Sequence, residues 1–192
     1  MKNYPIELKD GFILRRLNSS FVGEALKMRD EILEELRQNN ANELYIVDES
    51  DDEFNEFFSN PDVYSLGVLA PDGELVAVGV GSRRRGAIVK FAKLIPDFDA
   101  LPESAVGYVE LAQVKKEYRG RGFQRLFFDE LTEIFVETGA RYVAGIVSPN
   151  NKPSLRNFEA CGFKAVELFT HETTRFLRLK MLKDCRVANE NQ

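Results

Sequence analysis

Residues 119–122 read Arg-Gly-Arg-Gly and directly precede a segment whose apolar residues recur at helical spacing. The first turn of a helix presents unpaired backbone N–H groups, and the helix dipole favours an anion there. Glycines leave the backbone accessible to a phosphate, and arginines add charge and planar donors that suit phosphate oxygens. The pattern predicts a pyrophosphate-binding cradle. The alternative is a glycine turn at a helix start, flanked by solvated arginines.

Two widespread phosphate-binding motifs do not match this stretch. A Walker loop ends in Gly-Lys-Ser or Gly-Lys-Thr, whereas the sequence from Gly120 reads G-R-G-F-Q-R. A dinucleotide fingerprint needs G-x-G-x-x-G after the first strand of a βαβ unit, and this stretch comes late in the chain. The cradle must therefore be of another type.

The surrounding periodicity indicates the elements that position the cradle. A buried strand is expected over 105–114, a helix over 125–138, a strand over 141–148 and a short helix over 150–163. Upstream we expect a strand over 11–17, helices over 18–40 and 47–61, a hairpin of 63–70 and 74–82, and a long connection over 82–104. Two strands follow, over 164–170 and 174–182. This order predicts a mixed α/β domain around one sheet.

A second motif follows the cradle at a characteristic distance. The segment 150–163, "NNKPSLRNFEACGF", carries Asn151, Ser154, Phe158 and a final Gly-Phe pair. Together, the two motifs resemble those of the GNAT superfamily of acyl-CoA-dependent N-acyltransferases, whose cradle reads Q/R-x-x-G-x-G/A. Gln124 departs from that pattern at its third position. The resemblance implies a single domain over 1–192 with a CoA-binding core at about 105–170. It also implies a mostly antiparallel sheet of about seven strands, flanking helices and a splayed central pair.

The resemblance also implies how the chain would use acetyl-CoA, without a metal, to acetylate a primary amine of a small molecule or peptide. The pantetheine arm would pair with the backbone of the strand before the cradle, and a backbone N–H near Ala112 would polarise the acetyl carbonyl. The implied cofactor-binding residues are Ala112, Gln113, Val114, Arg119, Gly120, Arg121, Gly122, Phe123, Gln124, Asn151, Ser154 and Phe158.

Glu110 is the candidate general base, because several GNAT members carry a catalytic carboxylate on this strand. Strand alternation predicts that Glu110 points to the opposite face from Val109 and Leu111. A solvent-facing Glu and a carboxylate that binds the substrate ammonium are the alternatives. The family often has a tyrosine acid at the position of Phe158, which cannot donate a proton. A catalytically weak acyl-CoA sensor is therefore the alternative function, and Tyr108, Tyr142 and Cys161 are alternative acids.

Several other residues have weaker indications. His171, the only histidine, is expected to be exposed in a turn, with a contact to substrate as the alternative. The "SRRRG" stretch, 82–86, is expected to be a solvated loop, or else to bind the 3′-phosphate of CoA or an acidic acceptor. Phe54, Phe57 and Phe58 are expected in the core rather than in an acceptor pocket. The acidic residues Asp48, Glu49, Asp51, Asp52 and Glu53 are expected at a solvated helix start, or else attract a cationic acceptor.

Composition excludes some function classes. A net charge of −5 argues against unspecific nucleic-acid binding, because phosphate contacts need a basic face. No apolar run reaches the roughly 18 residues of a membrane span, and the first residues lack the apolar region of a signal peptide. We therefore expect a cytosolic protein with no membrane partner. The resemblance to GNAT enzymes, among which homodimers are common, also implies a homodimer as an option. Cys161 and Cys185 lack metal-ligand spacing and are expected to be reduced structural thiols.

Overall fold

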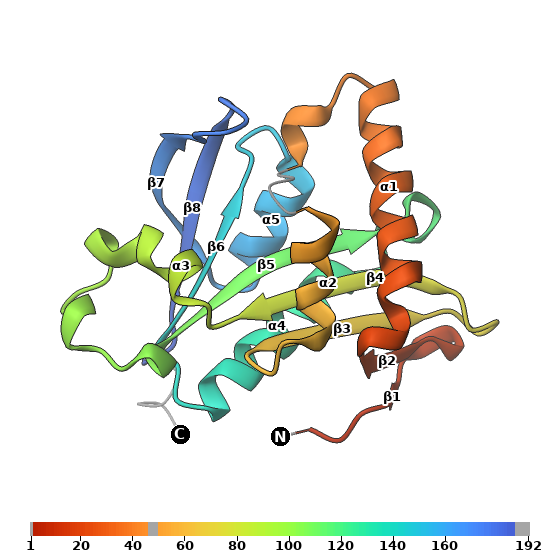
Figure 1. The fold of residues 1–192 in the computed structure, drawn as a ribbon, viewed down its shortest axis with the longest axis horizontal. Coiled ribbons are helices and arrows are strands. Elements are labelled where there is room, and N and C mark those ends of the chain that lie inside the picture. The colour runs from red at the N-terminus through yellow and green to blue at the C-terminus, as the bar shows by residue number, and fades with distance from the viewer. Residues whose placement is uncertain (1, 46–49, 187–192) are drawn as a thin grey trace.

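A single eight-stranded sheet organises the computed structural model, which describes residues 2–45 and 50–186 (Figure 1). The strand order is β1-β2-β3-β4-β5-β6-β8-β7, and each neighbouring pair is antiparallel except the parallel pair β5–β6. The mixed, mostly antiparallel sheet is confirmed, with one short strand, β1, beyond the seven expected. The strands are β1 Ile6–Glu7, β2 Ile13–Arg16, β3 Val63–Leu69, β4 Leu75–Ser82, β5 Val106–Val114, β6 Tyr142–Val147, β7 Lys164–Thr170 and β8 Leu177–Asp184.

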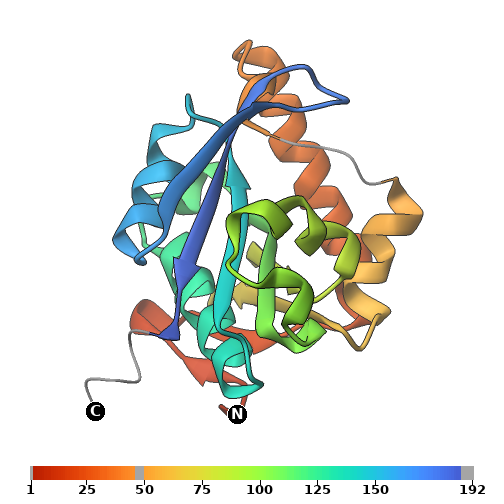
Figure 2. The same cartoon turned by 90° about the vertical axis from the view of Figure 1, so that its left-hand side faces the viewer.

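Helices cover both faces of this sheet, as Figures 1 and 2 show from two directions. Helices α1 and α2 pack on one face around a core that includes Met28, Phe54 and Val80. Helices α4 and α5 pack on the other face around Phe127, Leu131 and other buried residues. The predicted core role of Phe54, Phe57 and Phe58 holds, because each is at most 6% exposed. The helices are α1 Val22–Gln38, α2 Asp51–Ser59, α3 Arg85–Ile88, α4 Phe123–Glu137 and α5 Lys152–Ala160.

Close packing of α4 on β4 fixes how α4 lies across the sheet. A Cβ atom on Gly79 of β4 would lie 2.3 Å from Cγ of Phe127 in α4, so only glycine allows this approach. Phe127 is fully buried as a result. The N-terminal end of α4 is therefore held against the end of β5, where the predicted cradle lies.

The long connection after β4 folds into short helical turns rather than an open loop. It comprises α3, a 3-10 segment Val89–Leu94 and two further 3-10 turns before β5. Phe91 is fully buried and its ring lies 5.9 Å from that of Tyr108 on β5. The connection therefore packs onto the strand that carries Glu110. Asp48 and Glu49 of the predicted acidic run lie outside the described residues, and Asp51 pairs with Arg29 at 2.7 Å.

Candidate active site

The central strands β5 and β6 separate halfway along their length. Their parallel pairing runs from Val106↔Tyr142 to Val109↔Gly145 and ends there. Strand β5 nevertheless continues to pair with β4 as far as Val114. The second half of β5 therefore has β4 on one side and an opening on the other, which is the splayed arrangement that the resemblance to the GNAT superfamily implied.

A β-bulge at Glu110 coincides with this opening. Gly81 of β4 is opposite Val109 and Val80 is opposite Leu111, so Glu110 is the extra residue. The bulge reverses the alternation of side chains, because Val109 packs in the core under α4 whereas Leu111 packs against the core under α1 and α2. The prediction that Val109 and Leu111 share a face, opposite Glu110, was therefore wrong.

Glu110 is held by an ion pair and a short hydrogen bond. Its Oε1 atom accepts from Ser82 Oγ at 2.5 Å, and from Arg84 Nε at 3.1 Å and Nη2 at 2.9 Å. Its side chain is 6% exposed. No hydrogen bond from the described residues reaches Oε2. One carboxylate oxygen is thus fixed, and a charged partner offsets the cost of burying the group.

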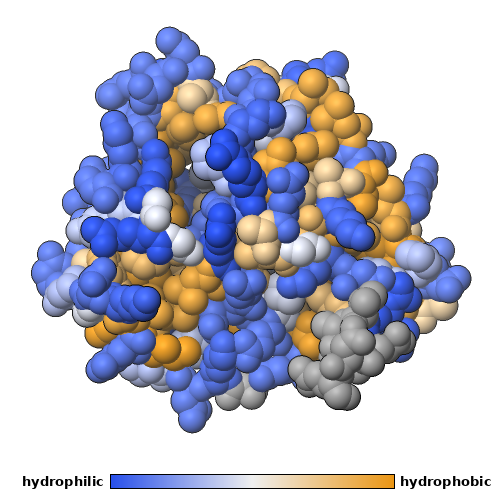
Figure 3. All heavy atoms as spheres, turned by 180° about the vertical axis from the view of Figure 1, so that it is seen from behind, coloured by the Kyte–Doolittle hydropathy of each residue, from blue (hydrophilic) through white to orange (hydrophobic). Residues whose placement is uncertain are grey.

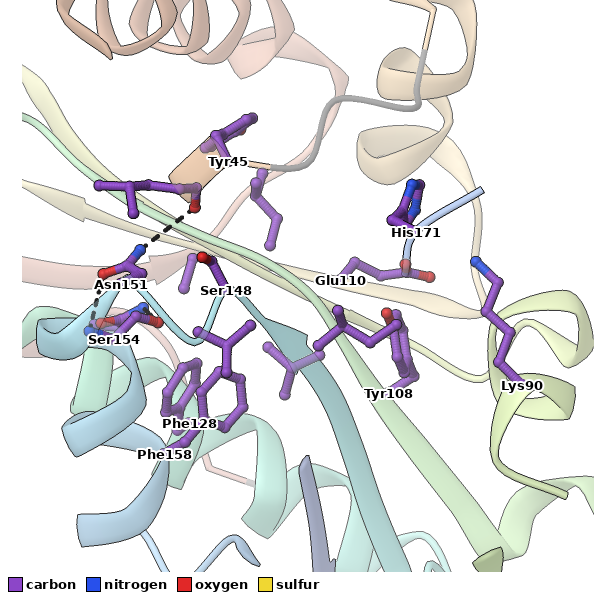
Figure 4. A pocket seen from close by; sticks show the side chains of 17 residues that line it. Tyr45, Lys90, Tyr108, Glu110, Phe128, Ser148, Asn151, Ser154, Phe158 and His171 are labelled. Atoms are coloured by element: carbon purple, nitrogen blue, oxygen red, sulfur yellow. Dashed lines mark hydrogen bonds between the residues drawn. The ribbon is translucent and has the colours of Figure 1, made fainter. Parts of the chain in front are cut away.

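A pocket of about 150 Å³ opens beside Glu110, as Figure 4 shows. Glu110 and Tyr108 come from β5, and His171 from the turn between β7 and β8. Figure 4 shows these three side chains and Lys90 around one part of the pocket, with Ser148, Asn151 and Phe158 around another. Polar groups from distant segments therefore converge where β5 and β6 separate.

His171 is buried, which contradicts its expected exposure in a turn. It is 8% exposed, and its Nδ1 atom accepts a hydrogen bond from the backbone N–H of Thr174 at 3.4 Å. The turn also closes through the His171 N–H, which donates to the carbonyl of Phe176 at 2.9 Å. The tip of the hairpin thus folds the imidazole over the pocket. This position agrees with the alternative expectation for His171, a contact with the substrate.

The "SRRRG" stretch is also more ordered than expected. Ser82 is fully buried and contacts Glu110, as does Arg84. Arg83 donates to the carbonyls of Phe135 at 2.9 Å and Thr138 at 3.2 Å, at the C-terminal end of α4. The prediction of a solvated loop was therefore wrong, and the side chains of Arg83 and Arg84 are engaged away from the predicted cradle. The signal that could have found them was a run of three arginines directly after a buried strand.

The predicted cradle has the backbone geometry that anion binding requires. Gly120 and Gly122 have φ angles of 81° and 85°, in the left-handed region, and Gly122 is the N-cap of α4. No side chain caps this helix among the described residues, so the amides of its first turn keep their donors. A Cβ atom on either glycine would meet no heavy atom within 4 Å. The loop therefore leaves space in front of the helix start.

This space belongs to a groove of about 580 Å³ between α1 and α5. Figure 3 shows the molecule hollowed between these two helices. The groove runs from the second half of β5 past the glycine loop to α5. It is lined by Ile32, Leu36, Leu44, Tyr45, Ala112, Gln113, Val114, Tyr118, Arg119, Gly120, Gly122, Phe123, Gln124, Arg125, Asn151, Pro153, Ser154, Arg156 and Asn157.

The two arginines of the loop have protein partners. Arg119 forms a bidentate ion pair with Glu35 of α1, at 2.8 and 2.6 Å, and its Nε donates to the carbonyl of Val114. Arg119 holds the pKa of the Glu35 carboxyl below its usual range. Arg121 lies 3.8 Å from Asp10 and over the ring of Phe12. Both arginines therefore contact other side chains rather than solvent alone. Arg121 contacts residues near β1 and β2.

Gln124 points sideways to α5 rather than into the loop. Its Nε2 donates to Ser154 Oγ at 2.9 Å and its Oε1 accepts from Asn157 at 2.6 Å. Asn151 caps α5 by accepting from the N–H of Ser154 at 3.2 Å. The two motifs are thus joined by hydrogen bonds, and the side chain that departs from the family pattern connects α4 to α5.

Phe158 is part of an aromatic cluster at the separation of β5 and β6. Its ring centre lies 4.1 Å from that of Phe128 and 5.1 Å from that of Phe163. A Cβ atom on Gly145 would lie 2.9 Å from the ring of Phe158. The ring therefore fills the space next to Gly145, the last residue of β6 that pairs with β5. It lines the pocket without offering a polar group.

Of the three alternative acids, Tyr108 lines the pocket. Tyr142 begins β6, at the end remote from the pocket, and burial raises its pKa. Cys161 is a buried free thiol beneath α4, and burial raises its pKa to about 11. Cys185 is likewise a buried free thiol. Among residues 2–45 and 50–186, no group of His, Cys, Asp or Glu side chains is arranged to hold a metal ion.

Comparison with known proteins identifies the family. Residues 28–163, more than half of the chain, match the model of the Acetyltransferase (GNAT) family. With the splayed strands and the glycine loop, this match shows that the chain belongs to the GNAT acetyltransferase family. No curated protein sequence matches the chain significantly.

Solved structures share the fold at low sequence identity. Arabidopsis thaliana NAA60 in complex with acetyl-CoA is 17% identical, with a TM-score of 0.67 over 91% of this chain and 98% of that chain. A GCN5-related N-acetyltransferase from Kribbella flavida is 18% identical, with a TM-score of 0.67 over 90% and 97%. A ribosomal-protein alanine acetyltransferase from Vibrio fischeri is 12% identical, with a TM-score of 0.67 over 96% and 98%. Within the described residues, no helix has the length and apolar character to span a membrane.

Proposed function

We propose that the protein transfers the acetyl group of acetyl-CoA to a primary amine of a small molecule or peptide. One observation carries the proposal: a held carboxylate, Glu110, and an uncapped helix start at Gly122 lie at opposite ends of one open strand segment. A thioester arm paired with that segment would reach from an anion site to a base. The family match and the likeness to an acetyl-CoA complex support the same choice of cosubstrate.

The groove fits the group that it would hold. The amides from Arg119 to Gln124 would bind the diphosphate, and Asn151, Ser154 and Phe158 would border the arm. Residues Ala112, Gln113 and Val114 would pair with pantetheine through their backbone. Arg121 is the weakest member of this set, because its guanidinium lies over Phe12. Phe158 lines the pocket beside Glu110, and the predicted residues other than Arg121 and Phe158 line one groove.

The reaction needs a neutral amine, because a protonated amine has no lone pair. Acetyl-CoA, when bound, supplies a thioester whose carbonyl carbon the amine attacks; a C–N bond forms and the C–S bond breaks. Glu110 accepts the proton of the amine, directly or through water, on the oxygen that Ser82 and Arg84 leave available. A backbone N–H near Ala112 stabilises the oxyanion. The thiolate takes its proton from Tyr108 or from water, since Phe158 has none to give.

We further propose that residues 1–192 form a single domain that acts in the cytosol. One core cluster contains both Phe12 and Cys185, so residues near both ends share a core. We also propose a homodimer. Its contact surface would include the apolar residues exposed on β7 and β8, Val166, Leu168 and Leu177. Light scattering after size-exclusion chromatography tests the dimer.

Two measurements test the enzymatic proposal. A thermal shift with acetyl-CoA reports binding, and thiol release against a panel of primary amines reports turnover. Stabilisation together with amine-dependent thiol release is expected. Absence of stabilisation by any CoA ester would sink the proposal. Stabilisation without turnover, with the same result in Glu110→Gln, would favour the alternative function, an acyl-CoA sensor. Phe158 is the reason for this alternative, because its side chain has no proton to donate to the leaving thiolate.

A further inference from the structure

Among the described residues, those around the pocket beside Glu110 have an unequal balance of charge. Of the 17 residues that line it, two carry a formal charge, Glu110 and Lys90. The guanidinium of Arg84 lies 2.9 Å from Glu110, so the carboxylate already has a cationic partner. Lys90 is thus the charged residue of the pocket lining whose ammonium has no oppositely charged partner among the described residues.

The backbone of Lys90 is fixed although its side chain is exposed. Its carbonyl accepts a hydrogen bond from Lys180 Nζ at 2.6 Å, and its neighbour Phe91 is fully buried. No ion pair or hydrogen bond joins the Lys90 ammonium to another described residue, including Glu110. Figure 4 shows its side chain directed toward the part of the pocket that contains Glu110 and His171. A fixed backbone thus presents a cation that has no ion-pair partner among the described residues at the place where the acceptor would lie.

His171 lies in the same part of the pocket, where Figure 4 shows its imidazole near Glu110. Its Nδ1 accepts a hydrogen bond from the backbone N–H of Thr174 at 3.4 Å, which helps to orient the ring. A signal from this imidazole therefore reports on a ligand that lies between Glu110 and Lys90.

We propose that the amine acceptor also carries an anionic group, in the simplest case the carboxylate of an amino acid, which Lys90 binds while the amine lies at Glu110. This proposal rests on the proposed function and specifies its substrate class. A pocket of about 150 Å³ suits a compact acceptor. A polycationic amine would bring a second positive charge toward Lys90, where like charges repel.

The test compares matched acceptors. Free L-amino acids and their primary amides differ in the carboxylate charge, and thiol release from acetyl-CoA gives kcat/KM for each pair. The amide has the more acidic ammonium and so more neutral amine, which would make it the faster acceptor if charge had no role. We expect the free acid to be preferred by about tenfold or more, a ratio equivalent to about 1.4 kcal/mol. Preference for amides or diamines would overturn the proposal.

Two variants locate the effect. Lys90→Glu should abolish the preference for the free acid and raise kcat/KM for diamines. Lys93→Glu makes the same charge change in the same 3-10 segment, Val89–Leu94, on an exposed residue outside the pocket lining, so it should keep the wild-type preference. Equal loss of preference in both variants would contradict a role specific to Lys90.

A binding measurement separates this proposal from the proposed function. Because His171 is the only histidine, its imidazole gives a single set of NMR signals. Free amino acids should shift these signals at lower concentration than their amides, in the presence of CoA, and Lys90→Glu should remove the difference. This result would support the substrate class even if no thiol were released. An equal or stronger response to amides or diamines, or no response to any acceptor, would overturn it.

Discussion

Arg84 donates two hydrogen bonds to a single oxygen of Glu110, from Nε at 3.1 Å and from Nη2 at 2.9 Å. Ser82 donates to the same oxygen. The bulge in β5 directs the carboxylate toward residues at the end of β4, and the ion pair keeps it oriented. The candidate base is therefore fixed by two neighbouring strands rather than by its own rotamer preference.

Removing the carboxylate charge tests its role in proton transfer. Glu110→Gln keeps the shape and the hydrogen-bond acceptor for Ser82 but loses the base. We expect kcat to fall roughly 100-fold, the lower end of what a positioned base contributes, with a smaller change in KM. Steady-state thiol release checks this. Glu117→Gln, at an exposed position, is the matched control, and equal activity of both variants would rule out a catalytic Glu110.

Removing the arginine tests the ion pair. Arg84→Met keeps an apolar stem near Phe57, whose ring the guanidinium covers at 5.0 Å, and leaves the buried carboxylate without its partner. We expect a loss of about 1–2 kcal/mol in unfolding free energy, moderated because the Arg84 side chain is 29% exposed. The double variant Arg84→Met/Glu110→Gln should recover part of this loss. Urea unfolding of all four proteins gives the coupling, and simple additivity would mean that the pair is not coupled.

The glycine loop can be tested separately from backbone strain. Gly122→Ala forces a Cβ into a left-handed conformation and should cost about 1–2 kcal/mol. Gly73, in the turn between β3 and β4, has a φ of 91° and similarly open surroundings. Gly73→Ala should therefore lose similar stability, whereas only Gly122→Ala should weaken the thermal shift produced by acetyl-CoA. If both variants kept the full shift, the helix start would not be the anion site.

The ion pair between Glu35 and Arg119 predicts a linked effect on pH and ligand binding. Glu35→Gln should release Arg119 toward a diphosphate and increase the thermal shift by acetyl-CoA. Because Arg119 lowers the pKa of Glu35 in the folded protein, the unfolded chain binds this proton more readily. The stability that the pair contributes is thus present above the unfolded pKa and is lost as pH falls through the lower, folded value.

Melting curves of wild type and Glu35→Gln from neutral to acid pH test whether the stability contributed by the pair is lost as pH falls. The stability difference between the two proteins should be constant near pH 7 and should narrow below about pH 4. The pair is partly exposed, with side chains 43% and 21% accessible, so the difference is expected to be small. A difference that widens at acid pH would contradict the assignment.

Local patterns were sufficient to predict the glycine loop before α4 and the order of the elements other than β1 and α3. The Arg-Gly-Arg-Gly run, the helical spacing after it and the Asn-Ser-Phe motif are short-range signals, and Gly120 and Gly122 have the positive φ angles that such a loop needs. The helix began two residues earlier than the segment from Arg125 that periodicity indicated. Boundaries of this kind depend on cap geometry, which composition reports poorly.

The contacts that complete the site join residues far apart in the sequence. Arg119 pairs with a residue 84 positions away, and Arg84 with one 26 positions away. The bulge at Glu110 changes which face each neighbour occupies, and strand alternation alone assumes regular pairing. The burial of His171 depends on how the β7–β8 hairpin folds over the sheet. Pairing partners, bulges and hairpin placement are tertiary properties, so sequence periodicity could not supply them.

The most direct test of the account is acetyl transfer itself. Purified protein is incubated with acetyl-CoA and the panel of amines, and both free CoA and N-acetylated amine are quantified by mass spectrometry. The account predicts equal amounts of the two products with at least one primary amine, and their loss in Glu110→Gln. Folded protein that binds acetyl-CoA but forms no acetylated amine with any acceptor, with Glu110→Gln behaving identically, would contradict it.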